Sequence, residues 1–115
     1  MFTFELNSDG KSYSVVDCDD SVTGGLVIPS TYKGKPVTVI GSDSIDFCEN
    51  ITSVVIPDSI TSIGVLAFES CYALKTVQIG KNVKIIGECA FEDCSSLSSI
   101  VIPASVQTID FGAFN

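Results

Sequence analysis

The chain has 115 residues, with 14 acidic residues, six lysines and no arginine or histidine, so its formal net charge is −8. This balance argues against binding to nucleic acid or to anionic membrane surfaces, because both need basic residues. No apolar run approaches the roughly 18 residues of a membrane-spanning helix, so membrane insertion is not expected, and the length indicates one domain.

Residues 1–25 are predicted to form an N-terminal β-hairpin cap. Phe2 and Phe4 alternate with polar residues, and the alternation resumes at Tyr13. Between these stretches, the run Asn-Ser-Asp-Gly ends at Gly10 and is typical of a hairpin turn. We expect the hairpin to cover the open edge of the structure that follows, where unpaired strands would otherwise recruit other chains. The alternative is an independent binding hairpin.

Residues 26–50 are an imperfect copy of a repeat that recurs later in the chain. The copy contains five additional residues, which lie within Ser30–Pro36. Glycine and proline in this insert indicate a turn. We expect the turn to project Tyr32, Lys33 and Lys35 as a candidate partner contact, because aromatic residues are enriched at interfaces. The alternative is a surface loop without a partner.

Residues 51–115 repeat one pattern every 23 residues without a gap, in copies at 51–73, 74–96 and 97–115, the last of them truncated. The shared frame is Leu/Ile-x-x-Val/Ile-x-Ile-Pro-x-x-Ile/Val-x-x-Ile-Gly-x-x-Ala-Phe-x-x-Cys. Such a repeat predicts a solenoid of stacked coils, in which each side chain packs on its copy one coil away. With the imperfect copy, residues 26–115 should form about four coils.

Each coil has predicted local elements. The β-branched residues at Val54–Ile56 favour a short strand, and a second extended segment is expected at Ile60–Ile63. Ala67–Cys71 places two small apolar residues four apart, as in one helical turn. We expect Gly64 and its copy Gly87 to turn the chain with positive φ.

Two further expectations concern the column of phenylalanines. Phe68, Phe91 and Phe114 occupy the same frame position and should stack inside the solenoid. In the imperfect copy, Ser44-Ile45 replaces Ala-Phe, and Phe47 is expected to fill the space from nearby.

The frame, written here as IPDSITSIGVLAFESC and IGKNVKIIGECAFEDC, resembles the BspA-type leucine-rich repeat over residues 26–115. That family occurs in bacterial surface proteins and in surface proteins of some protozoan parasites. The resemblance implies a right-handed leucine-rich-repeat solenoid, β-rich with short parallel strands and short helical turns. It also implies a binding surface used in adhesion or host contact, and it supplies no catalytic residues.

The residues outside the frame should face solvent and carry the function. One such row is Val65, Glu88 and Phe111, with Leu66 beside it, and it would place apolar side chains in water. Exposed apolar patches usually mark contacts. We therefore expect a non-catalytic protein-binding module, with a host or matrix protein as partner. The alternatives are that these side chains pack on adjacent turns, or that the repeat is a structural spacer or self-association unit.

No catalytic residue, cofactor site or metal site is expected. Without histidine or arginine, acid–base chemistry would fall to carboxylates, lysine or tyrosine, and no hydrolase or phosphate-loop motif occurs. Cys48, Cys71 and Cys94 lie 23 residues apart and should be buried thiols, although one disulfide between neighbouring coils remains open. Cys18 and Cys89 lie outside the frame, and the cysteine spacing is not that of a zinc site.

The ends of the chain suggest further expectations. The last coil has no visible polar cap, so either more coils follow in a longer parent or two uncapped ends meet in a homodimer. The N-terminus lacks the pattern of a signal peptide. By family resemblance, the parent protein belongs at the cell surface or outside the cell. Asn50-Ile51-Thr52 is a glycosylation sequon, relevant only in a secreted eukaryotic protein.

Overall fold

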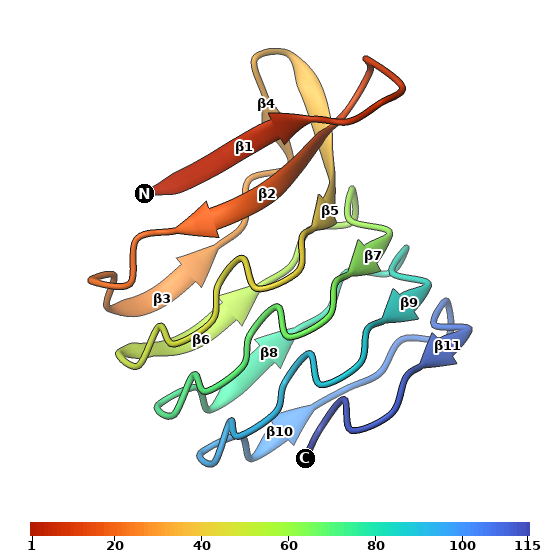
Figure 1. The fold of residues 1–115 in the computed structure, drawn as a ribbon. Helices are drawn as coiled ribbons and strands as arrows, with labels where there is room; N and C mark the ends of the chain where they lie inside the picture. The colour runs from red at the N-terminus through yellow and green to blue at the C-terminus, as the bar shows by residue number, and fades with distance from the viewer.

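The computed structural model describes residues 1–115 as a β-solenoid of eleven strands, stacked from an N-terminal hairpin to an open C-terminal coil (Figure 1). Each coil contributes one strand to each of two sheets, which have four and seven strands. No helix in the structure is long and apolar enough to cross a membrane. The predicted solenoid with short parallel strands is confirmed.

The first sheet runs in the order β10-β8-β6-β3, and all its neighbours are parallel. Its strands are β3 (Gly24–Val27), β6 (Ile51–Val55), β8 (Thr76–Gln78) and β10 (Ser99–Ile100). Val54 is opposite Val77, and Val77 is opposite Ile100. The 23-residue spacing therefore sets the register, since each apolar residue packs on its copy.

The second sheet continues from the cap through all four coils. It contains β5 (Lys35–Ile40), β7 (Ser62–Ile63), β9 (Ile85–Ile86) and β11 (Thr108–Ile109), all parallel. The cap is an antiparallel hairpin of β1 (Phe2–Leu6) and β2 (Tyr13–Cys18), and Gly10 adopts φ +68° in its turn. Because β2 pairs in parallel with β5, the hairpin occupies the edge that the first coil would otherwise expose. The predicted hairpin cap is confirmed.

The five-residue insert forms a second hairpin. β4 (Thr31–Tyr32) pairs with the start of β5 in the antiparallel sense. Lys33 and Gly34 connect the two strands with φ values of +50° and +77°, as the tightest hairpin turns require. The Tyr32 ring lies 4.1 Å from the Phe4 ring between centroids and 5.0 Å from the Tyr13 ring. The insert is thus packed against the N-terminal cap.

The third side of each coil consists of turns, so the predicted helical turn at Ala67–Cys71 is wrong. Leu66 and Ser70 adopt φ values of +59° and +58°, which a right-handed helix excludes. Alternate amides in this segment donate to carbonyls of the next coil, and Phe68 N to Ala90 O is 2.7 Å. Hydrogen bonds between coils therefore use the amide groups that would donate within the segment if it were helical.

Gly64 and Gly87 also have a different role from the one predicted, because neither has positive φ. A Cβ atom on Gly64 would lie 2.7 Å from the backbone nitrogen of Ser42 and 2.8 Å from the carbonyl carbon of Gly41. On Gly87 it would lie 2.7 Å from the carbonyl carbon of Gly64. These glycines allow neighbouring coils to approach closely, where any side chain would collide with backbone.

The three phenylalanine rings stack as predicted, but Phe114 at the end of the column is 40% exposed and not inside the solenoid. The Phe68 and Phe91 rings are stacked with centroids 5.1 Å apart, and the Phe91 and Phe114 rings are 5.3 Å apart. Phe68 and Phe91 are fully buried. In the first coil, Ile45 is fully buried at the equivalent position while Phe47 is exposed, so the expectation that Phe47 fills this space is wrong. Ile45 is large enough to continue the column by itself.

Candidate interaction surface

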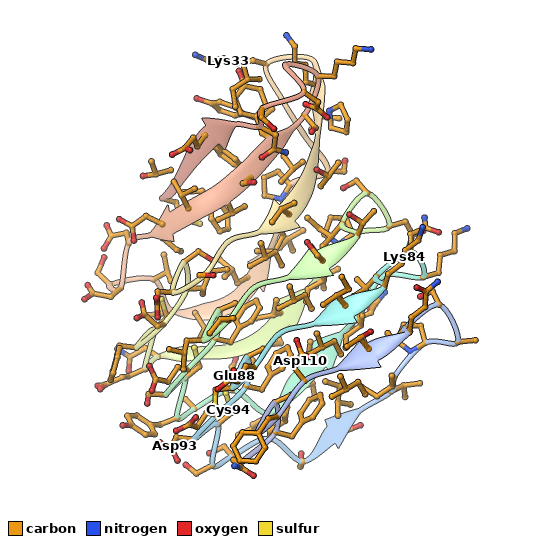
Figure 2. All side chains as sticks on the ribbon, turned by 45° about the vertical axis from the view of Figure 1, so that its right-hand side comes forward. Lys33, Lys84, Glu88, Asp93, Cys94 and Asp110 are labelled. Carbon is orange, nitrogen blue, oxygen red and sulfur yellow. The ribbon has the colours of Figure 1, made fainter.

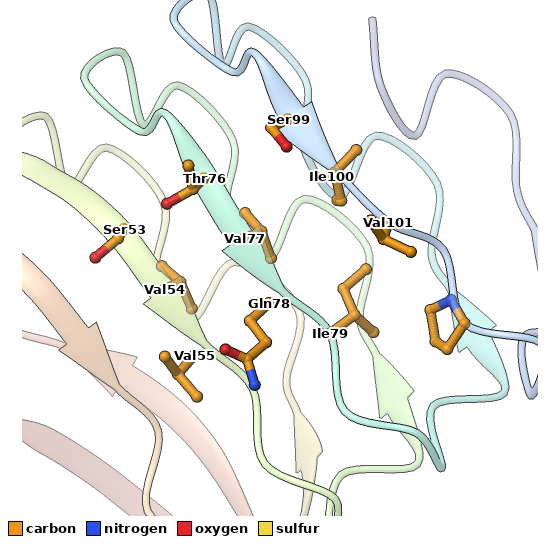
Figure 3. Close-up of a pocket in the computed structure, with 11 residues that line it drawn as sticks. Ser53, Val54, Val55, Thr76, Val77, Gln78, Ile79, Ser99, Ile100 and Val101 are labelled. Carbon is orange, nitrogen blue, oxygen red and sulfur yellow. The ribbon is translucent and has the colours of Figure 1, made fainter.

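An open groove of about 390 Å³ crosses the outer face of strands β6, β8 and β10 (Figure 3). Side chains alternate across a strand, so Val54 and its copies point into the core while the residues on either side point outward. The outward side chains form one hydroxyl row and one mainly apolar row: Ser53, Thr76 and Ser99, then Val55, Gln78 and Val101. The repeat thus builds the groove by placing the same kinds of side chain at every coil.

The groove is uncharged although the chain has a net charge of −8. None of its eleven lining residues is charged, and Val101 and Gln78 are exposed at its surface. A surface of hydroxyl, amide and methyl groups fits a partner through shape and hydrogen bonds, since it has no charge to pair. The 23-residue spacing aligns Val55, Gln78 and Val101 in one row, and the structure shows that this row lines a groove.

The candidates in the insert lie at the capped end of the solenoid, away from this groove (Figures 1 and 2). Tyr32 is half-buried between Phe4 and Tyr13, so the expectation that it projects into solvent is wrong. The Lys33 ammonium lies 5.5 Å from the Tyr32 ring centroid. Lys33 is exposed at this tip, whereas Lys35 at the start of β5 is half-buried.

The other predicted candidates lie on the turn side of the coils. Phe111 is 81% exposed, Val65 and Glu88 are also exposed, and Leu66 is half-buried. Glu88 accepts a hydrogen bond at its backbone carbonyl from the Leu66 amide, at 3.0 Å. These residues therefore form a ridge on neighbouring coils, separate from the insert.

The ridge also carries carboxylates that the sequence analysis missed. Asp46, Glu69 and Glu92 share one frame position, a 23-residue spacing that was visible in the sequence. Carboxylate oxygens of Asp43, Asp46 and Glu69 lie within 4.8 Å of one another, so this is where a cation would find converging donors. Partial burial, followed by the charge of Asp43, raises the pKa of Asp46. Partial burial, followed by the charge of Glu92, raises the pKa of Glu69.

Removing one of these charges should stabilise the protein at neutral pH. A carboxyl group whose pKa is raised on folding destabilises the folded state when it is ionised. This cost, which comes from partial burial and then from repulsion, is therefore present near pH 7 and is relieved as the pH falls through the raised folded pKa. We expect Glu69→Gln to raise Tm at pH 7 by up to about 4 °C, an ordinary surface effect. Thermal melts of both proteins from pH 3 to 7 should converge at the acidic end.

Glu5→Gln provides the control, because Glu5 is an exposed carboxylate on β1 with no such neighbours. Its melting temperature should follow that of the wild type across the same pH range. A gain from Glu69→Gln that persists undiminished at pH 3 would contradict ionisation of Glu69 as the cause.

The chain is similar to a known protein family and to several solved structures. The model of the family described as "BspA type Leucine rich repeat region (6 copies)" matches residues 27–115. A leucine-rich repeat protein of Bacteroides capillosus has a TM-score of 0.83 and 40% identity, and the match covers 95% of this chain and 83% of that one. No functionally curated protein matches the sequence.

Two longer structures are also similar. The leucine-rich repeat protein of T. pallidum has a TM-score of 0.90 and 28% identity, covering 94% of this chain and 50% of its own length. A leucine-rich cell surface protein of Faecalibacterium prausnitzii has a TM-score of 0.86 and 30% identity, covering 98% of this chain and 28% of that one. This chain therefore spans half or less of these two proteins. From the family match over most of its length, the chain belongs to the BspA-type leucine-rich repeat family.

Proposed function

We propose that this chain is a non-catalytic protein-binding module of a cell-surface or secreted protein, and that its partner is a host or matrix protein. The observation that carries the proposal is the uncharged groove across β6, β8 and β10, which is lined by outward side chains from the same frame positions of each coil. The similarity to a cell surface protein supports the location. Repeat proteins of this kind generally serve as structural or binding modules rather than enzymes.

The exposed ridge provides a second contact in this proposal. Phe111 and Val65 offer apolar area, and Glu88 between them offers a charge to a basic partner. Lys33 and Lys35 would form a separate contact at the capped end, where the Lys33 ammonium lies 5.5 Å from the centroid of the Tyr32 ring. The half-buried Leu66 shapes the ridge rather than projecting from it.

Gln78→Glu should weaken partner binding about tenfold or more. The new carboxylate would be covered in a groove that has no cation to pair with it, and an unsatisfied buried charge costs at least about 1.4 kcal/mol. Binding would be measured by surface plasmon resonance against a panel of purified extracellular-matrix and host surface proteins. The matched control is Gln107→Glu, which makes the same change at an exposed position outside the groove. Equal binding by both variants would contradict the groove as the contact.

Self-association is a second candidate function, favoured by the open C-terminal coil. Ile109 is 47% exposed, whereas its copy Ile86 is fully buried, and Phe114 is also exposed. Strands β10 and β11 are edge strands at this end, while the hairpin covers the other end of the second sheet. Two copies would therefore meet tail to tail through these edges.

Ile109→Lys should weaken such a dimer by about tenfold or more, because a lysine at the centre of an apolar interface is desolvated without a partner. The control is Ile85→Lys, since Ile85 is 44% exposed on β9 but faces outward and not the open end. Sedimentation velocity over a concentration series would separate the two variants. A wild-type protein that stays monomeric at all concentrations would refute self-association while leaving the groove proposal intact.

A further inference from the structure

Four of the five cysteines form a single column through the core, including Cys18 from the cap. Cys18, Cys48, Cys71 and Cys94 all belong to the buried core. Cys18 lies outside the repeat frame, but β2 pairs with the first coil and brings the Cys18 side chain close enough to Cys48 for each to shift the pKa of the other. An even number of cysteines in one column permits every thiol to have a partner, which three could not do.

The backbone register places these cysteines on successive coils. Phe47 N donates to Glu69 O and Ser70 N donates to Glu92 O, both at 2.8 Å, immediately before Cys48 and Cys71. Coils bonded in this way repeat at about 4.8 Å, within the Cα separations of about 4.4–6.8 Å that disulfides span. The side chains of Cys71 and Cys94 point the same way, since each Sγ lies 3.2 Å from a backbone carbonyl of the coil before it.

The thiols associate in two pairs. The Cys71 and Cys94 side chains lie close enough for each to shift the pKa of the other, and so do those of Cys18 and Cys48. The neighbouring Cys71 lowers the pKa of Cys94, whereas the neighbouring Cys94 together with burial raises the pKa of Cys71. The same pattern lowers the pKa of Cys18 and raises that of Cys48. In each pair, the cysteine with the lowered pKa, Cys94 or Cys18, ionises more readily, and its partner stays protonated.

The cysteine that ionises more readily in each pair also has the larger exposed fraction. Cys48 and Cys71 are completely buried, whereas Cys94 is 9% and Cys18 is 6% exposed. Cys94 also lines an open cavity of about 360 Å³ at the C-terminal end, between Phe91, Leu97 and Phe114. Figure 2 shows Cys94 on the coil beside Asp93, at the end of the molecule opposite Lys33. A small reagent can therefore approach Cys94 through this cavity while Cys71 stays covered.

We propose that Cys71–Cys94 and Cys18–Cys48 are two dithiol sites that a small disulfide oxidises to covalent links between coils. The Cys94 thiolate attacks one sulfur of the oxidant, forms a mixed disulfide and releases one thiol. Cys71 then gives up its proton, and its sulfur displaces the second thiol to form the Cys71–Cys94 bond. Each site loses two protons and two electrons, and the oxidant disulfide is reduced to two thiols. Cys18 and Cys48 react in the same way.

Oxidation of the native 115-residue chain with glutathione disulfide tests the proposal. After remaining thiols are alkylated, cleavage after glutamate and after lysine, except at the Lys35–Pro36 bond, separates the five cysteines onto residues 12–33, 34–49, 70–75, 89–92 and 93–115. We expect 70–75 linked to 93–115 and 12–33 linked to 34–49, with a loss of four hydrogen atoms in the intact protein. Because each link closes a loop of the unfolded chain, Tm should rise by about 5–10 °C over the reduced protein.

Two variants identify the role of each thiol. Cys71→Ser should leave glutathione bound to Cys94 as a stable mixed disulfide, because the displacing thiol is absent. If that variant does not fold, Cys94→Ser at the edge of the core should abolish the link to 70–75 and keep the link between 12–33 and 34–49. Cys89→Ser is the matched control and should leave both links unchanged, since Cys89 lies outside the column. A Cys48–Cys71 link, or thiols that react only after denaturation, would overturn the proposal.

Discussion

Phe91→Ala is expected to lower the free energy of unfolding by about 3–5 kcal/mol, the usual cost of truncating a buried phenylalanine. Phe91 is 1% exposed and is the central ring of the column, with Phe68 and Phe114 on its two faces. Its loss would leave a cavity that neither neighbour can fill, because both rings are held by their own coils. A domain of this size has about 5–15 kcal/mol of stability in total, so the substitution would remove a substantial share of it.

Urea denaturation followed by circular dichroism would measure this change. Lys84→Ala is the control, since Lys84 is exposed and the substitution should alter stability by less than about 0.5 kcal/mol. Equal destabilisation by the two substitutions would mean that the assignment of inward and outward positions is wrong.

Gly64→Ala is expected to destabilise the protein by about 3 kcal/mol or more, although it adds a single methyl group. Overpacking a core usually costs about 1–3 kcal/mol when side chains can move aside. Here the added Cβ would meet backbone atoms of Gly41 and Ser42 at 2.7–2.8 Å. The backbone at this point is fixed by the bond from Gly64 N to Ile40 O, at 2.7 Å, so the two coils would have to separate.

Gly25→Ala is the matched control for this prediction. Its Cβ would meet the Ser53 Oγ atom at 3.1 Å, and that hydroxyl can rotate away. We expect a change of less than about 1 kcal/mol from Gly25→Ala. The two variants would be compared by urea denaturation under the same conditions. A small effect at both positions would show that the coils can separate at little cost, contrary to the close approach at Gly64.

The same two residues show how far the sequence predicts this molecule. Phe91 could be assigned to the core from its 23-residue spacing alone, because a side chain in a solenoid packs on its own copies. Gly64 could be identified as a required glycine, but the reason for it depends on how closely two coils approach. That distance is set by the hydrogen bonds between coils, which a single repeat does not reveal.

The positions at which the first coil departs from the repeat frame were the hardest to predict. Ile45 takes the phenylalanine position in the first coil, while Phe47 points outward. Both residues are apolar, and the choice between them follows from the left-handed conformation of Phe47 at φ +56°, which is shared by its copies at Ser70 and Asp93. A residue-type pattern does not record backbone conformation, so it favoured the larger side chain.

By itself, the sequence determined the number of coils, the parallel register, the phenylalanine column and the hairpin that covers one end. Each of these follows from a local pattern or from a fixed period, and stacking converts a period directly into a neighbour in space. Only the tertiary structure decided the uncharged groove, the convergence of the Asp43, Asp46 and Glu69 carboxylates, the turns in place of helices and the addition of Cys18 to the cysteine column. These features depend on how one coil bonds to the next and on how the cap folds back, contacts between distant segments that no single repeat contains.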